Sequence, residues 1–218
     1  MEPGHAGLPG AGRAALPVEQ YALIGDTHTA ALVGRNGSID WLCLPRFDPG
    51  ACFAGLLGGE EHGFWRIAPV GGAGRVVHRY RGETLVLETE FHTPDGVARL
   101  VDCMPRCSGH ASVARVVEGV SGRVAMRMDL VIRFDYGWVV PWMSRAGDHL
   151  HGIAGPDSVC LATPAQTRGE NLRTVAEFTV GPRGAGPVCA VVAPAVPVTW
   201  MITFMPSCLW RPAWQNTS

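Results

Sequence analysis

The chain has 218 residues, of which 47% are hydrophobic, and its formal net charge is −1. This length and composition can bury a sizeable core, either in one all-β domain or in two smaller ones. The 18 basic residues are all arginine and are balanced by 19 acidic residues, so the strongly basic surface typical of nucleic-acid-binding proteins is excluded. We therefore expect no nucleic-acid partner.

The first segment, residues 1–17, is rich in Gly, Ala and Pro, and we interpret it as a disordered leader. It lacks the basic start and the apolar centre of a secretory signal peptide. We expect the folded part to begin near Val18.

A hairpin is predicted around Asn36-Gly37, because both residues tolerate positive φ and fit a two-residue type I′ turn. Thr29–Val33 forms the first strand and Ser38–Leu44 the second. Strict alternation would place Ile39, Trp41 and Cys43 on one face of the second strand and Asp40, Leu42 and Leu44 on the other. Pro45 then ends the strand, because it has no N–H to donate.

The next three residues, Arg46, Phe47 and Asp48, place a cation, an aromatic ring and an anion on a loop that leaves the predicted sheet. Such loops often carry binding groups. The simpler interpretation is structural, with Trp41 in the core and Arg46 paired with Asp48. The residues alone favour that interpretation.

Most of the remaining chain reads as short strands separated by Gly/Pro turns. Further strands are predicted at Tyr21–Ile24, Gly63–Pro69, Arg75–Tyr80, Thr84–Thr93, Val97–Cys103, Ser112–Gly119, Val124–Phe134, Trp138–Trp142, His149–Ile153, Ser158–Ala162 and Leu172–Val180. One short helix is predicted within Ala51–Leu57, ended by Gly58-Gly59. This regular spacing of strands predicts an all-β fold, an antiparallel β-sandwich with little helix.

The last segment, residues 184–218, is atypical because no charged residue occurs from Gly184 to Trp210. Its apolar stretch is long enough for a membrane span, but four prolines interrupt it and no basic cluster would orient it, so we do not expect membrane insertion. A shifted reading frame or an aberrant end would explain the composition. Exposed aromatic residues there would predict aggregation or a missing neighbour.

Seven cysteines are scattered along the chain and odd in number, which indicates reduced thiols of a cytoplasmic protein and not a disulfide framework. Cys103 and Cys107 have no second pair at zinc-binding spacing. No phosphate-binding loop, dinucleotide fingerprint or zinc-protease motif is present. We therefore expect no metal and no cofactor.

Several short segments of the sequence, taken together and in order, resemble the N-terminal domain of the bacterial glucoamylase and trehalase family of glycoside hydrolases (glycoside hydrolase family 15). The strongest are Tyr21–Asp26, Thr29–Val33 and Asn36–Asp48, and others are Ala51–Ala54, Leu56–Gly58, Thr84–Glu90, Thr93–Gly96, Val116–Gly122, Arg133–Gly137, Val140–Trp142, Ala154–Pro156 and Val175–Thr179. The resemblance covers about residues 18–181. It implies a large two-sheet, supersandwich-like domain at 18–183 that precedes a helical catalytic toroid.

The same resemblance implies an enzyme that hydrolyses α-glucosidic bonds with inversion, using two glutamates carried by the toroid. Inversion requires an acid and a base on opposite sides of the scissile bond. No segment of this chain resembles the family's catalytic motifs, so we assign no catalytic residue and expect the chain alone to be inactive. The helical catalytic domain is the expected partner, and the choice between trehalose and maltose-type substrates stays open.

Local acid pairs and histidines offer weaker alternatives. Glu60-Glu61, Glu88 with Glu90, and Asp95 with Asp102 could each supply two carboxyl groups, but such pairs usually belong to a solvated surface. His149 and His151 share a strand face without an evident third metal ligand. His28 beside Asp26 lacks a nearby nucleophile motif, and we read it as local hydrogen bonding.

Two functional classes remain. In the first, the chain is the non-catalytic half of a trehalase or glucoamylase, and Trp41, Arg46, Phe47 and Asp48 face the catalytic domain or its sugar pocket. Aromatic faces stack on sugars, and Arg and Asp bond to hydroxyl groups. In the second, the chain is a stand-alone carbohydrate-binding or interaction module that binds an α-glucoside weakly.

Overall fold

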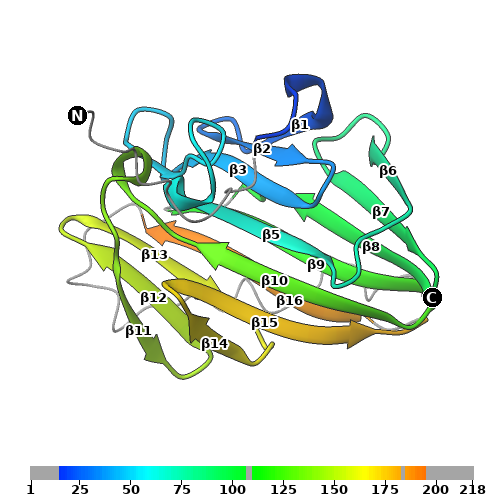
Figure 1. Cartoon of the computed structure of the whole chain (residues 1–218). Helices are drawn as coiled ribbons and strands as arrows, with labels where there is room; N and C mark the ends of the chain where they lie inside the picture. The colour runs from blue at the N-terminus through cyan, green and yellow to red at the C-terminus, as the bar shows by residue number, and fades with distance from the viewer. Residues whose placement is uncertain (1–14, 107–109, 183–184, 195–218) are drawn as a thin grey trace, which may run out of the picture.

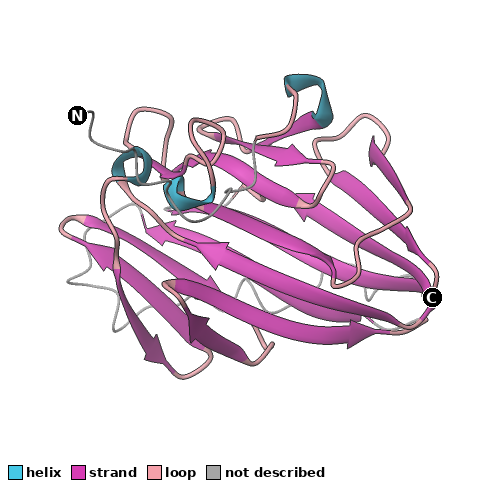
Figure 2. Cartoon of the chain, in the orientation of Figure 1, coloured by secondary structure: helices cyan, strands magenta, loops and turns pink. Residues whose placement is uncertain are grey.

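The computed structural model describes residues 15–106, 110–182 and 185–194, and these form two antiparallel sheets packed face to face (Figures 1 and 2). Three 3₁₀ turns, η1 Val18–Gln20, η2 Glu60–His62 and η3 Asp135–Gly137, are the helical segments of this part of the chain. The predicted all-β sandwich with little helix is confirmed. No helix among the described residues is long and apolar enough to cross a membrane.

The first sheet, sheet A, has eight strands in the order β1-β2-β3-β5-β10-β15-β14, with β4 paired to β3. Its strands are β1 Tyr21–Gly25, β2 Ala30–Gly34, β3 Ser38–Cys43, β4 Ala51–Phe53, β5 Phe64–Pro69, β10 Val124–Val131, β14 Thr167–Glu170 and β15 Arg173–Val180. Ala51–Phe53 is therefore a strand, and the helix predicted over Ala51–Leu57 is wrong. The three residues pair with β3 and are fully or almost fully buried, so tertiary pairing overrides the local signal.

The second sheet, sheet B, has eight strands in the order β11-β12-β13-β16-β9-β8-β7-β6. Its strands are β6 Arg75–Tyr80, β7 Leu87–Thr93, β8 Gly96–Cys103, β9 His110–Gly122, β11 Trp142–Ala146, β12 His149–Ala154, β13 Asp157–Ala162 and β16 Ala185–Pro194. The strand predicted at Trp138–Trp142 is wrong for all but its last residue. The chain instead passes through η3 and a single bridge between Phe134 and Val139 before β11 begins.

Strand β16 lies in the segment 184–218, which the sequence predicts to be an atypical tail. It pairs with β9 over most of its length and with β13 near its end, so it fills a central position of sheet B. Cys189 and Val191 belong to the main core. The sandwich therefore includes ten residues beyond the predicted boundary at residue 183. The predicted disorder of residues 1–14 and the predicted aberrant end at 195–218 lie outside the described residues.

The main core lies between the sheets and is built from the inward residues of both. Its largest fully buried members are Trp65, Phe53 and Phe91. The alternation predicted for the second hairpin strand does not hold, because Ile39 and Leu42 both lie in this core while Trp41 packs on the other face. The register shifts by one residue between β2 and β3 at this point. An extra residue in one strand reverses the facing of the residues that follow it.

The hairpin at Asn36-Gly37 is present, but its loop has three residues and only Gly37, with φ +76°, takes positive φ. The Gly37 N–H donates to the Gly34 carbonyl at 2.9 Å, as in a type I turn followed by a left-handed residue. A Cβ at residue 37 would lie 2.2 Å from the Ile67 carbonyl oxygen, so glycine is required both by the positive φ and by this close approach. The predicted two-residue type I′ turn is therefore wrong.

Candidate functional site

An apolar row crosses the outer face of sheet A and forms the candidate functional site. Leu23 pairs in register with Leu32, and Leu32 pairs with Trp41, so three neighbouring strands present one side chain each. Each of the three residues is next to a core residue along its strand, and its side chain lies on the other face of the sheet. The ring of Trp41 then contacts the ring of Tyr136 in η3, with centroids 6.0 Å apart. We call Leu23, Leu32, Trp41 and Tyr136 the apolar row.

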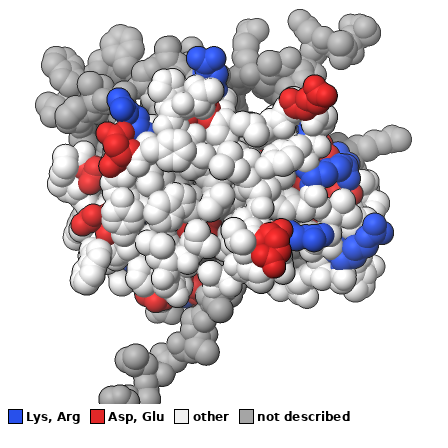
Figure 3. Space-filling model, turned by 90° about the horizontal axis from the view of Figure 1, so that it is seen from above, with Lys and Arg blue, Asp and Glu red and all other residues white. Residues whose placement is uncertain are grey.

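The row is accessible to solvent, with Leu23 44% and Tyr136 38% exposed and both Leu32 and Trp41 partly exposed. Beneath Trp41, Cys43, Ala51 and Ala54 form a small buried cluster separate from the main core. Seen from above, this side of the molecule carries few charged residues at its centre, and most of the charge lies toward the rim (Figure 3). Neighbouring apolar side chains on a sheet face are a feature that interaction surfaces share.

The outer edge of the row is fixed by a residue of sheet B. The Tyr80 hydroxyl donates to the Leu23 carbonyl at 2.9 Å and accepts from the Leu23 N–H at 3.0 Å. β1 is an edge strand, and its free backbone groups would otherwise be open to pairing with another chain. Tyr80 blocks that pairing and leaves the side chain of Leu23 on the surface.

The loop between β3 and β4 carries the residues singled out from the sequence. Arg46 and Asp48 form the expected ion pair at 2.9 Å, with side chains 69% and 71% exposed, and Phe47 is 59% exposed. A pair this exposed contributes little to stability. The structural interpretation expected Trp41 in the core, but Trp41 lies outside the main core and is half-buried on the outer face. None of the four residues is buried in the sandwich, and their role at an interface stays a prediction.

η3 holds this loop against the sheet. A Cβ at Gly50 would lie 3.0 Å from the Cα of Asp135, so the two backbones approach closely. Arg133, just before η3, donates its N–H to the Cys52 carbonyl of β4 at 3.2 Å. Beyond η3 the chain exposes Trp138 by 85% and Trp142 by 78%. The β3–β4 loop and the η3 segment thus belong to one end of the molecule.

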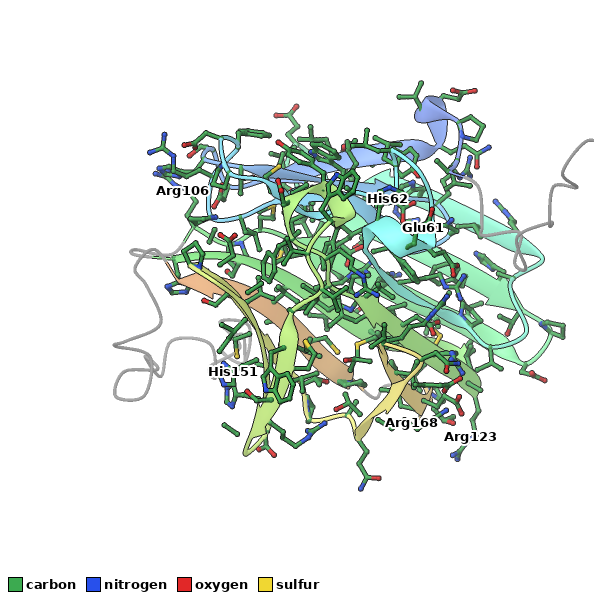
Figure 4. All side chains as sticks on the ribbon, turned by 60° about the vertical axis from the view of Figure 1, so that its left-hand side comes forward. Glu61, His62, Arg106, Arg123, His151 and Arg168 are labelled. Atoms are coloured by element: carbon green, nitrogen blue, oxygen red, sulfur yellow. The ribbon has the colours of Figure 1, made fainter. Side chains whose placement is uncertain are left out.

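Several of the carboxylates considered from the sequence lie beside arginine or histidine side chains. Glu60 pairs with Arg173 at 2.8 Å, and Glu61 lies 3.3 Å from His62, both near η2 (Figure 4). Asp102 is fully buried against Arg115.

Glu88 and Glu90 belong to an arginine network on β6, β7 and β8. Burial raises the pKa of Glu88, but the hydrogen bond and charge of Arg81, with Arg99 and Arg79, outweigh it and lower the pKa overall. The hydrogen bond from Arg99 lowers the pKa of Glu90, and Arg79 adds to the effect. Both carboxyl groups are therefore held as anions, which is the wrong state for an acid catalyst.

The histidines do not form a catalytic or metal-binding group in the described part of the chain. The rings of His149 and His151 stack with centroids 6.4 Å apart, and burial together with the charge of His149 lowers the pKa of His151. No set of three or more His, Cys, Asp or Glu side chains among the described residues could hold a metal ion. Asp26 accepts hydrogen bonds from the backbone N–H groups of His28 and Thr29, in agreement with local hydrogen bonding.

A buried ion pair that the sequence analysis does not single out joins the two sheets. Arg115 of β9 binds Asp102 of β8 through two hydrogen bonds of 2.8 and 3.1 Å, and both side chains are fully buried. The same guanidinium donates to the carbonyl oxygens of Trp65 at 2.6 Å and Gly37 at 2.8 Å, and it lies over the Trp65 ring. The sequence carries one sign of this burial, because Arg115 alternates with Val113 and Val117 on the apolar face of its strand.

Comparison with known proteins gives a consistent result. A family model described as "Trehalase-like, N-terminal" matches residues 10–192. The chain is 29% identical over 181 residues to a trehalase of Thermoplasma volcanium, covering 80% of this chain and 29% of that protein. It is 32% identical to trehalase 1 of Sulfolobus acidocaldarius over 67% of this chain and 25% of the relative, and 28% identical to a trehalase of Mycobacterium tuberculosis over 72% and 26%. The chain thus spans less than a third of the length of these relatives.

Proposed function

The chain belongs to the trehalase-like N-terminal family, and on this premise we propose that it is the non-catalytic, strand-built domain of an enzyme that hydrolyses α-glucosidic bonds. The observation that carries the proposal is the pairing of Glu88, Glu90 and Asp102 with arginine, beside an apolar row on the outer face of sheet A that the described residues leave partly exposed. The pairing of these carboxylates with arginine argues against catalysis in this domain. The apolar row provides a surface for the domain that performs the catalysis.

The apolar row is the surface that we propose for contact with a helical catalytic domain. Three of its four side chains, those of Leu23, Leu32 and Trp41, stand on hydrogen-bonded strands, so they form a rigid platform that loses little conformational freedom on binding. An interface centre is typically apolar and aromatic with a polar rim. Leu32 and Trp41 fit the centre, and the exposed pair Arg46–Asp48 fits the rim.

Phe47 extends the same surface beyond the sheet. In the proposed assembly, Phe47 and Asp48 reach the mouth of the sugar-binding cleft from the side of this domain. An exposed ring can stack on a glucosyl face, and the carboxylate can accept hydrogen bonds from sugar hydroxyl groups. The choice of glycoside hydrolase family 15, with inverting chemistry, follows from the sequence resemblance and belongs to this proposal.

We also place the protein in the cytoplasm. The five cysteines within the described residues are free thiols, and four of them are buried. Burial raises the pKa of Cys160 to about 11 and also raises that of Cys189, so these thiols resist oxidation. A reducing compartment preserves such thiols.

The non-catalytic role is tested by incubating the purified 218-residue chain with trehalose and with maltose and measuring released glucose. We expect no release above that of a boiled sample. Turnover that Glu88→Gln or Glu90→Gln abolishes in a folded protein would place the reaction in this domain and end the proposal. If the chain is instead a stand-alone carbohydrate-binding module, trehalose or maltose will quench tryptophan fluorescence in a saturable way that Phe47→Ala weakens.

A further inference from the structure

A cleft opens along one edge of the sandwich, where the two sheets separate. It has a volume of about 320 Å³ and lies between β14–β15 of sheet A and β11–β12 of sheet B. Its floor is apolar and is formed by Leu130 and Ile132, which belong to the main core, and by Leu150, which packs against that core. Cavities of this size accommodate small organic ligands.

The two walls of the cleft are tied together across its side. Arg145 of β11 donates to the Thr167 carbonyl of β14 at 3.2 Å and also contacts the Thr167 hydroxyl. This bridge joins edge strands of different sheets. The cleft is therefore a feature of the packed sandwich and does not depend on a single loop.

Positive charge dominates the lining. Four arginines, Arg133, Arg145, Arg168 and Arg173, line the cleft together with one carboxylate, Glu170. Arg168 lies toward the lower part of the molecule as drawn in Figure 4 and pairs with Glu177 at 3.0 Å, while Arg173 pairs with Glu60 at 2.8 Å. Within the described part of the chain, neither Arg133 nor Arg145 has a carboxylate partner.

Arg133 is the least compensated of these groups. It is partly buried, and among the described residues its guanidinium donates only to the carbonyl of the preceding residue, Ile132, at 2.7 Å. Burial lowers the pKa of Arg133, and the like charge of Arg173 lowers it further. A partly buried cation beside a second cation raises the free energy of the empty cleft, and an anion placed between them would offset that cost.

We propose that this cleft binds a small organic anion that combines a carboxylate with a short apolar body. The carboxylate would accept hydrogen bonds from Arg133, with Arg173 contributing charge, and the apolar body would cover Leu130, Ile132 and Leu150. A guanidinium presents several N–H donors in a plane that matches a carboxylate. The lining of the cleft includes none of the four residues of the apolar row.

Hexanoate is a suitable probe, with hexanamide as a neutral ligand of the same length. Isothermal titration of the full chain should show saturable hexanoate binding that rising salt weakens, and hexanamide affinity at least about tenfold lower. Arg133→Met should reduce hexanoate affinity by about tenfold or more. Arg123→Met is the matched control, since Arg123 precedes β10 and the cleft residues lie at the other end of that strand, and it should bind as the wild type does.

A second measurement uses only the unmodified protein. Phenylglyoxal modifies accessible arginines, and mass spectrometry reports each site. Hexanoate should slow the modification of Arg133 and leave that of Arg123 unchanged. Equal affinity for hexanamide, wild-type affinity in a folded Arg133→Met variant, or failure of hexanoate to protect Arg133 would each overturn the proposal.

Discussion

Replacing Arg115 by methionine is expected to be among the most damaging single changes in the described sandwich. The substitution keeps much of the side-chain volume but removes the guanidinium that holds Asp102, the Trp65 carbonyl and the Gly37 carbonyl. Asp102, fully buried, would then keep its charge without a partner or take up a proton. Breaking a buried ion pair in this way costs about 3–5 kcal/mol.

The two carbonyl groups add to this loss. Each buried acceptor left without a donor costs about 1–3 kcal/mol, although water entering the cavity would recover part of it. We expect a total of about 4–6 kcal/mol, which is comparable to the whole stability of many domains. With a urea m value of about 2 kcal/mol per M, the unfolding midpoint should fall by about 2–3 M.

Urea unfolding followed by tryptophan fluorescence measures this effect. Arg123→Met, at an exposed arginine, should change the free energy of unfolding by less than about 0.5 kcal/mol. The double variant Asp102→Leu/Arg115→Met should lose less stability than Arg115→Met alone, because it leaves no buried charge. An Arg115→Met protein within about 1 kcal/mol of the wild type would refute the assignment of Arg115 as the link between the sheets.

Three further predictions concern separate parts of the fold. Gly37→Ala should lower the free energy of unfolding by about 1–3 kcal/mol or more, since φ is +76° and the added Cβ meets the Ile67 carbonyl, and thermal unfolding measures it against Gly71→Ala, where nothing lies within 4 Å. Tyr80→Phe should cost about 1 kcal/mol and increase amide exchange at Leu23, because the edge strand loses both hydrogen bonds to the hydroxyl. The pKa of Glu90 is lowered in the folded state, so the stabilisation that its carboxylate provides is present above its unfolded pKa of about 4.3 and is lost as the pH falls through the lower folded value. Urea unfolding midpoints measured between about pH 6 and about pH 3 should therefore fall less steeply for Glu90→Gln than for the wild type.

The sequence predicts most strands because the strands carry their own signals. Pro94-Asp95 forms the two-residue turn between Thr93 and Gly96, in the gap between the strands predicted at Thr84–Thr93 and Val97–Cys103. Strand ends differ by a few residues where side chains cannot decide them. β7 begins at Leu87, after a turn in which Thr84 bonds to the Arg81 carbonyl.

Features that depend on distant parts of the chain are not predicted. The bulge that turns Trp41 outward depends on how β3 pairs with β2, and a fixed two-residue period cannot reveal it. Likewise, the apolar row arises from the register of three strands, so Leu23 and Leu32 gain a role only once their neighbours are known. The cleft depends on two sheet edges separated by many residues, and its arginines look like ordinary surface charges in the sequence.

The most direct test of the proposed role is binding between this chain and the segment of the Thermoplasma volcanium trehalase that lies outside the matched region. Titration calorimetry should detect a complex for the wild type and for Val120→Lys, but at least about tenfold weaker binding for Leu23→Lys. The two positions are matched, since Leu23 is 44% and Val120 is 43% exposed and both lie in strands. Absence of a complex with the wild type, or equal affinity for Leu23→Lys and Val120→Lys, would contradict the apolar row as the docking surface of a catalytic domain.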